Sequence, residues 1–184
     1  MSPDELGPDQ KQIGISIAIP PPFAEELTAA RESFGDPLAR AIPPHITLLG
    51  PTIVNVGDLD MIRDHTARAA NTIKPFRVHL RGTATFRPIS PVVFIQVVQG
   101  ISECEALERA VRSGPLDLPT RFNYHPHVTI AHEVPERELD RAFADMDSYN
   151  AIFQINKIHL FEHGSDHRWR PVTSFPLGSS GRIS

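Results

Sequence analysis

Two similar five-residue motifs guide the interpretation of the whole chain: Pro44-His45-Ile46-Thr47-Leu48 and Pro126-His127-Val128-Thr129-Ile130. In an extended strand successive side chains point to opposite faces, so the His and the Thr of each motif share one face. The two aliphatic residues share the other face. Proline suits the first position of a strand because it has no N–H to donate to a ladder. We therefore expect two strands, each with a polar face and an apolar face buried in a core.

The composition of the 184 residues narrows the class of protein. A hydrophobic fraction of 40% is enough for one compact domain with a core. The formal net charge of −4 gives no basic field that would hold the protein to duplex DNA. Cys104 is the single cysteine, which rules out an internal disulfide and fits a reducing compartment, and we expect it to be a buried structural thiol.

We expect the first residues to be a loose tail and not a targeting signal. Acidic residues precede the apolar run 13–19, which alternates Ile with small residues as a half-buried strand does and is too short to span a bilayer. We expect a cytoplasmic monomer with no membrane partner. Residues 1–12 and 178–184 are expected to be flexible tails on a single domain at 13–177.

Local signals predict an alternation of strands and helices. Asp58 and Ser102 are well placed to cap helices, and Gly82 is a candidate bulge. Gly50-Pro51 is expected to end the first histidine strand. Besides the two histidine motifs, the expected strands are 13–19, 76–86, 92–98, 151–162 and 171–177, and the expected helices are 22–34, 58–73, 102–112 and 135–146.

Each half of the chain has the same order of elements: strand, helix, histidine strand, helix, strand. This order predicts an α+β fold with two pseudo-symmetric lobes, mainly antiparallel sheets and outer helices. The histidine strands are expected to be central in their sheets and to face each other across a cleft. A doubly wound parallel sheet is the alternative. We favour the antiparallel arrangement because parallel strands covered on both sides are apolar throughout, whereas these strands have one polar face.

Two histidines and two threonines facing one cleft suit a particular kind of reaction. Histidine titrates near neutrality, so one ring can remove a proton on one side of a reacting centre while the other delivers one. Threonine hydroxyls can donate hydrogen bonds to the non-bridging oxygens of a phosphoryl group as negative charge builds. The set His45, Thr47, His127 and Thr129 therefore predicts in-line displacement at phosphorus with no metal or other cofactor.

With these motifs the chain resembles the two-histidine (2H) phosphoesterase superfamily, in its branch of bacterial RNA 2′-5′ ligase-like cyclic phosphodiesterases. That family carries two His-x-Thr/Ser-x motifs, one in each lobe. The flanks agree as well, with Pro43-Pro44 before and Gly50-Pro51 after the first motif and Tyr124-His125-Pro126 leading into the second. The likeness extends over about residues 13–177.

The resemblance implies hydrolysis of a 2′,3′-cyclic phosphate, at an RNA end or in a small cyclic nucleotide, to a 2′-phosphate. In some members it also implies the joining of RNA ends by a 2′-5′ bond. By the family's usual assignment His127 activates the water and His45 protonates the leaving oxygen. Thr47 and Thr129 then hold the non-bridging oxygens.

Three other interpretations compete with this one. His125 and His127 form an H-x-H pair that a metal could use together with His45 or His132. A two-lobed module could bind a nucleotide or an RNA end without turning it over, although binding alone is better served by Arg or Lys than by neutral His. A hydrolase of a small cyclic nucleotide metabolite fits the lack of overall basicity.

Five further residues are candidates for substrate binding: Tyr124, Phe86, Arg87, Arg168 and Trp169. Tyr124 stands where the family usually carries an aromatic residue. Phe86 and Arg87 precede a turn between the two halves, where a base or phosphate contact competes with core packing of the Phe ring. Arg168 and Trp169 belong to a polar loop, whose alternative role is a solvated turn anchored by one aromatic residue.

Overall fold

The computed structural model describes residues 5–178, and within them the chain alternates strands and helices. The elements are β1 (Gln10–Ala18), α1 (Phe23–Ser33), β2 (His45–Asn55), α2 (Leu59–Asn71), β3 (Phe76–Thr85), β4 (Val92–Gln99), α3 (Ile101–Val111), β5 (His127–His132), α4 (Glu136–Asp145), β6 (Asn150–Ile155), β7 (Lys157–His163) and β8 (Trp169–Pro176). Short 3₁₀ turns at Val56–Asp58 and Gly114–Leu116 complete the order. None of the described helices is long and apolar enough to cross a membrane.

The ends of the chain differ in part from the expected tails. Residues 1–4 and 179–184 lie outside the described residues. β1 begins inside the expected N-terminal tail, because Gln10 to Gln12 pair with the far end of β2. At the other end the N–H of Gly178 donates a hydrogen bond to the carbonyl of Ile73 over 2.8 Å.

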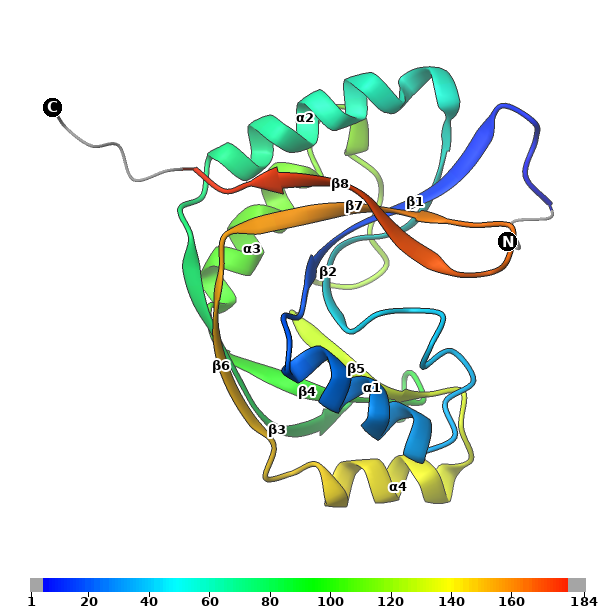
Figure 1. Cartoon of the computed structure of the whole chain (residues 1–184), viewed down its shortest axis with the longest axis vertical. Helices are drawn as coiled ribbons and strands as arrows, with labels where there is room; N and C mark the ends of the chain where they lie inside the picture. The colour runs from blue at the N-terminus through cyan, green and yellow to red at the C-terminus, as the bar shows by residue number, and fades with distance from the viewer. Residues whose placement is uncertain (1–4, 179–184) are drawn as a thin grey trace, which may run out of the picture.

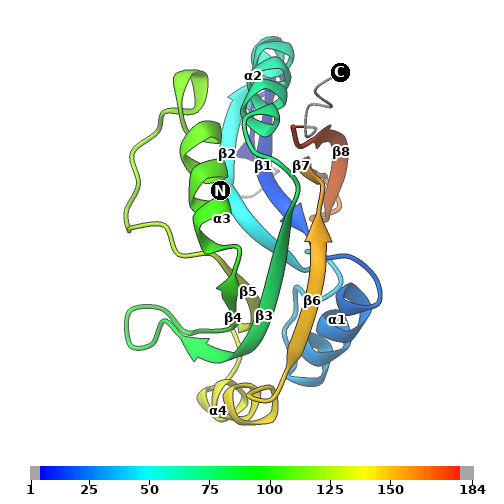
Figure 2. The ribbon, with the colours of Figure 1, turned by 90° about the vertical axis from the view of Figure 1, so that its left-hand side faces the viewer.

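The strands form two four-stranded antiparallel sheets, ordered β2-β1-β7-β8 and β5-β4-β3-β6. Figure 1 shows the two sheets one above the other, with α2 beyond the first and α4 beyond the second. The same arrangement is seen from the side in Figure 2. The predicted α+β fold with two lobes and antiparallel sheets is confirmed.

The two lobes are not the two halves of the sequence. The first sheet takes its strands from both ends of the chain, and the second takes its strands from the middle. The single strand expected at 151–162 is therefore wrong. It breaks at exposed Asn156, so that β6 pairs with β3 in one sheet while β7 pairs with β1 and β8 in the other. The alternation of side chains runs almost unbroken through this crossing, which explains why the pattern alone predicts one strand.

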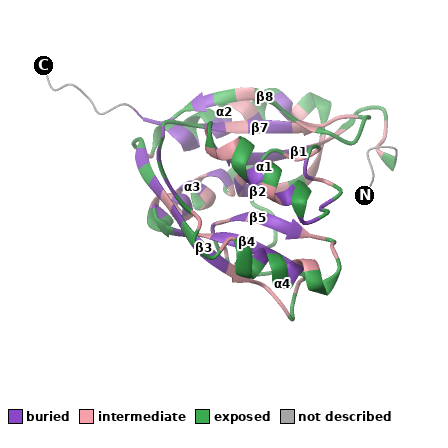
Figure 3. Cartoon of the chain, turned by 60° about the horizontal axis from the view of Figure 1, so that its bottom comes forward, coloured by how far each residue is buried: buried purple, intermediate pink, exposed green. Residues whose placement is uncertain are grey.

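The histidine strands lie at sheet edges, which corrects the expectation that they are central. β2 is the edge of the first sheet, β5 is the edge of the second, and the two strands contact each other (Figure 3). A central strand has a hydrogen-bonded neighbour on both sides, whereas an edge strand keeps one side open. Here the open sides of the two strands face each other, so the polar groups of both motifs border the same space.

The helices interlock the lobes. α1 follows β1 of the first sheet but packs against β5 of the second, and α3 follows β4 of the second sheet but packs against β2 of the first. α2 covers β7 and β8, while α4 covers β3, β4 and β5. Each histidine strand is thus supported by a helix that belongs to the other lobe.

β2 does not end at Gly50-Pro51 but continues to Asn55. The register with β1 shifts between Ile13 and Ile15, which accommodates an extra residue of β2 as a bulge. An edge strand tolerates proline because one of its sides is unpaired. The bulge expected at Gly82 is confirmed by a register shift in β3 and by the positive φ of 69° at this glycine.

Neither of the two predicted capping side chains, Asp58 and Ser102, caps its helix. Asp58 does precede α2, but its carboxylate accepts a hydrogen bond from Asn55 and makes no capping bond. Ser102 lies inside α3, which begins at Ile101 after Gly100. Gly100 has a φ of 93°, and a Cβ there would lie 2.8 Å from the carbonyl oxygen of Arg77. A tight left-handed turn therefore sets this helix start, because only glycine fits it.

The predicted packing of the two motifs is confirmed. Ile46, Leu48, Val128 and Ile130 are all at most 2% exposed and belong to the shared core. Cys104 is fully buried in the same core, and burial raises the pKa of its thiol to about 12, as expected of a structural cysteine.

Replacing Gly100 by alanine should destabilise the fold by about 1–3 kcal/mol, because alanine is strained at positive φ and its Cβ would contact the Arg77 carbonyl. Gly57→Ala is the matched control, since a Cβ there meets open space. The measurement is the free energy of unfolding from urea titrations. Equal stability of the two variants would contradict the left-handed turn at Gly100.

Candidate active site

The two motifs have the same pattern of burial. In both, the proline and the two aliphatic residues are buried while the His and the Thr are half-buried. The strands β2 and β5 bring the two polar pairs to one place, and the imidazoles are close enough for the charge of His45 to lower the pKa of His127. The expected convergence of the motifs is thus present in the structure.

Both imidazoles are held in the same way by the backbone. Nδ1 of His45 lies 2.7 Å from the carbonyl oxygen of Pro43, and Nδ1 of His127 lies 2.7 Å from that of His125. A carbonyl only accepts, so each Nδ1 carries the hydrogen and donates it. In the neutral ring Nε2 then has a free lone pair, and this nitrogen can take up or release a proton. In both motifs a buried proline stands between this carbonyl and the histidine.

Burial keeps both rings neutral in the free protein. It lowers the pKa of His45, and the positive charge of Arg31 lowers it further, while the bond to Pro43 acts in the opposite direction. Burial also lowers the pKa of His127 to about 4, with further lowering from the charges of His125 and His45. Both Nε2 atoms are therefore proton acceptors at neutral pH.

The two threonines accompany the histidines on their polar faces. Thr47 lies opposite Ser16 of β1, and Thr129 lies opposite Phe94 of β4. Within residues 5–178 neither threonine hydroxyl has a hydrogen-bond partner. Both half-buried hydroxyls are therefore available to a bound molecule.

Tyr124 connects the two motifs. Its hydroxyl donates a hydrogen bond over 2.8 Å to the carbonyl oxygen of Thr47, although the two residues belong to different lobes. Burial raises the pKa of Tyr124, so the hydroxyl keeps its proton and remains a donor. The structure thus gives this candidate a tethering contact with the backbone of the first motif.

Phe86 packs on the second motif. Its ring is perpendicular to that of His127, with centroids 4.9 Å apart, and it also contacts Phe94 at 4.4 Å. Such edge-to-face contacts fix the orientation of a ring. The sequence left open whether Phe86 stacks on a base or packs, and the observed contacts are those of packing around His127.

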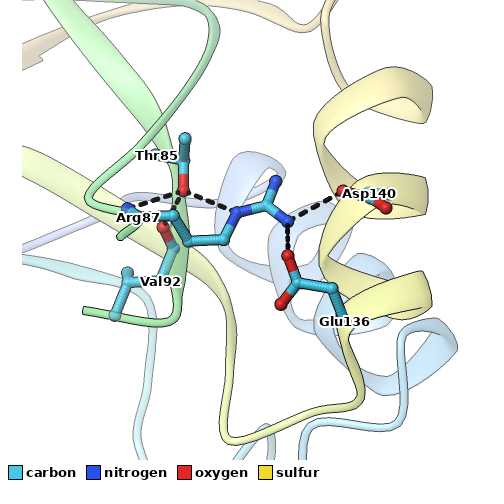
Figure 4. A network of polar contacts seen from close by, with 5 residues as sticks. All are labelled: Thr85, Arg87, Val92, Glu136 and Asp140. Atoms are coloured by element: carbon cyan, nitrogen blue, oxygen red, sulfur yellow. Dashed lines mark hydrogen bonds and ion pairs between the residues drawn. The ribbon is translucent and has the colours of Figure 1, made fainter. Parts of the chain in front are cut away.

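The side chain of Arg87 extends toward α4, as Figure 4 shows. Its guanidinium pairs with Glu136 at 2.6 Å and with Asp140 at 2.8 Å, and its Nε donates to the hydroxyl of Thr85. These two carboxylates raise the pKa of Arg87 and neutralise its charge. The structure does not bring this candidate to the site.

A pocket opens beside the first motif, and Trp169 lines it. The indole is stacked on the ring of His163, with centroids 4.8 Å apart and an angle of 5° between the planes. Arg168 is exposed and does not line this pocket. The lining residues are Gly14, Ser16, Ile42, Pro43, His45, Thr47, Leu49, Gly50, Pro51, Phe161 and Trp169.

A buried ion pair supports the loop that leads to His45, and the sequence analysis missed it. Arg31 and Asp36 are 3% and 5% exposed, and both Nε and an NH2 group of Arg31 donate to the same carboxylate oxygen. Arg31 also donates to the carbonyl of Ile42, three residues before the histidine. The available signal was an arginine in the last turn of a helix followed by Gly35-Asp36, where a glycine lets the chain turn back.

The alternative of an H-x-H metal site finds no third ligand. His125 and His127 stand with their ring centroids 6.5 Å apart. In the described part of the chain, no three His, Cys, Asp or Glu side chains come together as a metal would require.

Comparison with known proteins identifies relatives over nearly the whole chain. The family model described as the 2'-5' RNA ligase superfamily matches residues 19–167. A candidate phosphoesterase of Bacillus cytotoxicus is 24% identical over 173 residues, which cover 93% of this chain and 99% of that protein. A candidate phosphoesterase of Geobacillus thermodenitrificans is 26% identical, with 77% of this chain and 83% of that protein covered.

Solved structures share the fold. The crystal structure of E. coli LigT complexed with NADP+ superposes with a TM-score of 0.71 at 16% identity, over 93% of this chain and 99% of that one. E. coli LigT complexed with 3'-AMP gives a TM-score of 0.67 at 17% identity, over 92% and 99%. The protein TT0787 of Thermus thermophilus gives 0.55 at 21% identity, over 92% and 100%.

Replacing Asp36 by alanine should cost about 3–5 kcal/mol of stability, because Arg31 is left charged and unpaired in the interior. Removing the pair together, as Arg31→Met with Asp36→Leu, should recover most of this loss. Asp60→Ala breaks the exposed pair with Arg63 and serves as control, with a cost below about 1 kcal/mol. Urea unfolding measures all three, and a small loss in Asp36→Ala would show that Arg31 reaches water.

Proposed function

The chain belongs to the 2'-5' RNA ligase superfamily, and on that premise we propose that it is a phosphoesterase that hydrolyses 2′,3′-cyclic phosphates to 2′-phosphates. The substrate is an RNA end or a small cyclic nucleotide. The observation that carries the proposal is the pair of imidazoles whose Nδ1 atoms are fixed by backbone carbonyls and whose Nε2 atoms are free. The candidate phosphoesterases among the relatives support the same class of reaction.

The mechanism assigns the two free Nε2 nitrogens to opposite sides of one phosphate. Nε2 of His127 takes a proton from a water molecule, whose oxygen forms a bond to phosphorus. The bond from phosphorus to O3′ breaks in line with this attack, and Nε2 of His45 delivers a proton to O3′. The phosphate then remains on O2′. Thr47 and Thr129 donate hydrogen bonds to the non-bridging oxygens, where negative charge increases in the transition state.

The protonation states favour this division of roles once the substrate is bound. His127 has the pKa of about 4 and is therefore neutral, as a general base must be. His45 must carry a proton to act as acid, and the negative phosphate next to it raises its pKa. All proton transfers are thus performed by side chains, which leaves no task for a Lewis acid.

The same arrangement suits 2′-5′ ligation. If the 5′-hydroxyl of a second RNA occupies the position of the water, its attack on phosphorus with departure of O3′ produces a 2′-5′ bond. The description of the family supports this second activity. Incubation of a cyclic-phosphate-ended oligonucleotide with a 5′-hydroxyl oligonucleotide tests it by the appearance of a joined product.

A small nucleotide metabolite is a further candidate substrate, and three observations favour it. The chain has a formal net charge of −4, and within residues 5–178 no Lys or Arg lines the pocket beside His45. E. coli LigT has been crystallised with 3'-AMP and with NADP+. A module that only binds nucleotides is less favoured, because its phosphate site would consist of two neutral imidazoles.

Replacing His45 or His127 by alanine should lower turnover by about 10²- to 10⁴-fold, since each removes one proton transfer. Thr47→Val and Thr129→Val should cost less and act mainly on kcat. The assay is hydrolysis of 2′,3′-cyclic nucleotides and cyclic-phosphate-ended oligonucleotides in the presence of a chelator, with the product identified as a 2′-phosphate. His79→Ala on β3 is the control and should be as active as wild type. Unchanged turnover in both histidine variants would refute the mechanism.

The pH profile of kcat/KM should be bell-shaped, because the base must be neutral and the acid protonated. Burial lowers both pKa values, that of His127 to about 4, so both limbs should lie below the ordinary histidine value of about 6.5. The profile of kcat should shift to higher pH, since the bound phosphate favours protonated rings. Initial rates between pH 4 and 9 measure both profiles. A rate that rises steadily toward pH 9 would contradict the assignment.

A further inference from the structure

The two motifs are near copies, but their surroundings differ. On the side of the second motif, the rings of Phe86 and Phe94 pack against His127 with centroids 4.9 and 5.1 Å away. On the side of the first motif the space is open, and it is the pocket that Trp169 lines. A substrate larger than a phosphate therefore has room for its remaining part beside His45.

Glycine creates the floor of this pocket. A Cβ on Gly14 would lie 3.5 Å from the Trp169 ring and 3.3 Å from the carbonyl oxygen of Leu49. Since glycine lacks this atom, the indole lies directly over the backbone of β1. Ser16, two residues further along the same strand, faces the same pocket and lies opposite Thr47.

The aromatic wall is fixed before any ligand binds. Trp169 stacks on His163, and Nδ1 of His163 is 2.8 Å from the side-chain oxygen of Gln12 on β1. The backbone N–H of Trp169 donates to the carbonyl of Ala41 over 2.9 Å. Phe161 extends the wall from the neighbouring strand β7. A preorganised wall binds a flat ligand at little entropic cost.

The chemistry of the lining indicates what the pocket holds. Among the described residues that line it, none is acidic, and apart from His45 none can carry a positive charge. Two aromatic rings, two prolines and several aliphatic groups dominate, and the side-chain hydroxyls of Ser16 and Thr47 are among its few polar groups. Such a surface suits a flat, uncharged and aromatic group.

We infer that this pocket binds the nucleobase of the nucleoside that carries the cyclic phosphate, packed against Trp169 and Phe161. The inference rests on the proposed function. It places the nucleoside on the first lobe, so that the leaving O3′ stays beside His45 and the water approaches from the side of His127. Because stacking uses the face that every base has, the pocket accepts all four bases, with purines ahead of pyrimidines through their larger rings.

The test compares Trp169→Ala with wild type on two substrates, a nucleoside 2′,3′-cyclic phosphate and methyl riboside 2,3-cyclic phosphate, which has no base. With the nucleoside, kcat/KM should fall roughly 5- to 150-fold, mainly through KM, as expected for the loss of one stacking partner. With the riboside the change should stay below about twofold, because there is no base to lose contact with. Trp169→Phe should restore most of the loss.

Two further variants complete the design. Gly14→Ala adds a Cβ to the floor of the pocket at 3.5 Å from the indole, which is ordinary van der Waals contact, and it should also raise KM for the nucleoside alone. Phe122→Ala removes an aromatic ring that is 64% exposed and does not line the pocket, so it should behave as wild type. Thermal unfolding verifies that each variant is folded.

Equal losses on both substrates in Trp169→Ala, or no loss on either, would overturn the inference. If wild type hydrolyses neither substrate, the proposed function fails. The pocket is then tested separately by calorimetric titration with adenosine 2′-monophosphate. Weaker binding to Trp169→Ala than to wild type would still support the base site, and equal affinity would refute it.

Discussion

Two strand edges that lie side by side without pairing are the constraint on which the rest of this molecule depends. Unpaired edges are usually a hazard because they invite pairing with another chain. Here β2 and β5 shield each other, and the bulged, proline-containing course of β2 makes a continuous ladder difficult. The two sheets therefore remain separate at this point. The space between them can then be bordered by polar side chains from both.

Core packing, two crossing helices and a hydrogen bond hold the edge strands β2 and β5 in their relative positions. The aliphatic residues of both motifs are buried in one core, so neither strand can rotate without exposing them. α1 and α3 cross to the opposite lobes, and the Tyr124 hydroxyl binds the backbone of the first motif. The carbonyl bonds to Nδ1 then leave each imidazole little freedom. The rigid scaffold thus also limits the movement of the two Nε2 atoms to which we assign proton transfer.

The sequence predicted what depends on local pattern and failed where distant partners decide. Alternation of polar and apolar residues predicts the shared face of His and Thr and the burial of the aliphatic residues between them. The conformational freedom of glycine predicts the bulge at Gly82. The edge position of the histidine strands and the crossing at Asn156 depend on which strands become neighbours, and alternation carries no information about that. Arg87 resembled a free phosphate ligand because Glu136 and Asp140 lie far from it in the sequence. The Arg31–Asp36 pair and the helix start at Gly100 depend on backbone geometry, which residue types alone do not determine.

The division of the sheets between the ends and the middle of the chain has a consequence for the order of assembly during translation. All partners of β3, β4, β5 and β6 lie within the middle of the sequence, so the second sheet can form while the ribosome is still at work. β1 is synthesised first, but its second neighbour, β7, is synthesised much later. Trp169, which forms a wall of the pocket, is part of β8 and is made later still. Contacts between such distant segments form slowly. The first sheet, together with the pocket wall that Trp169 supplies, can therefore be completed only after its last strand has been released.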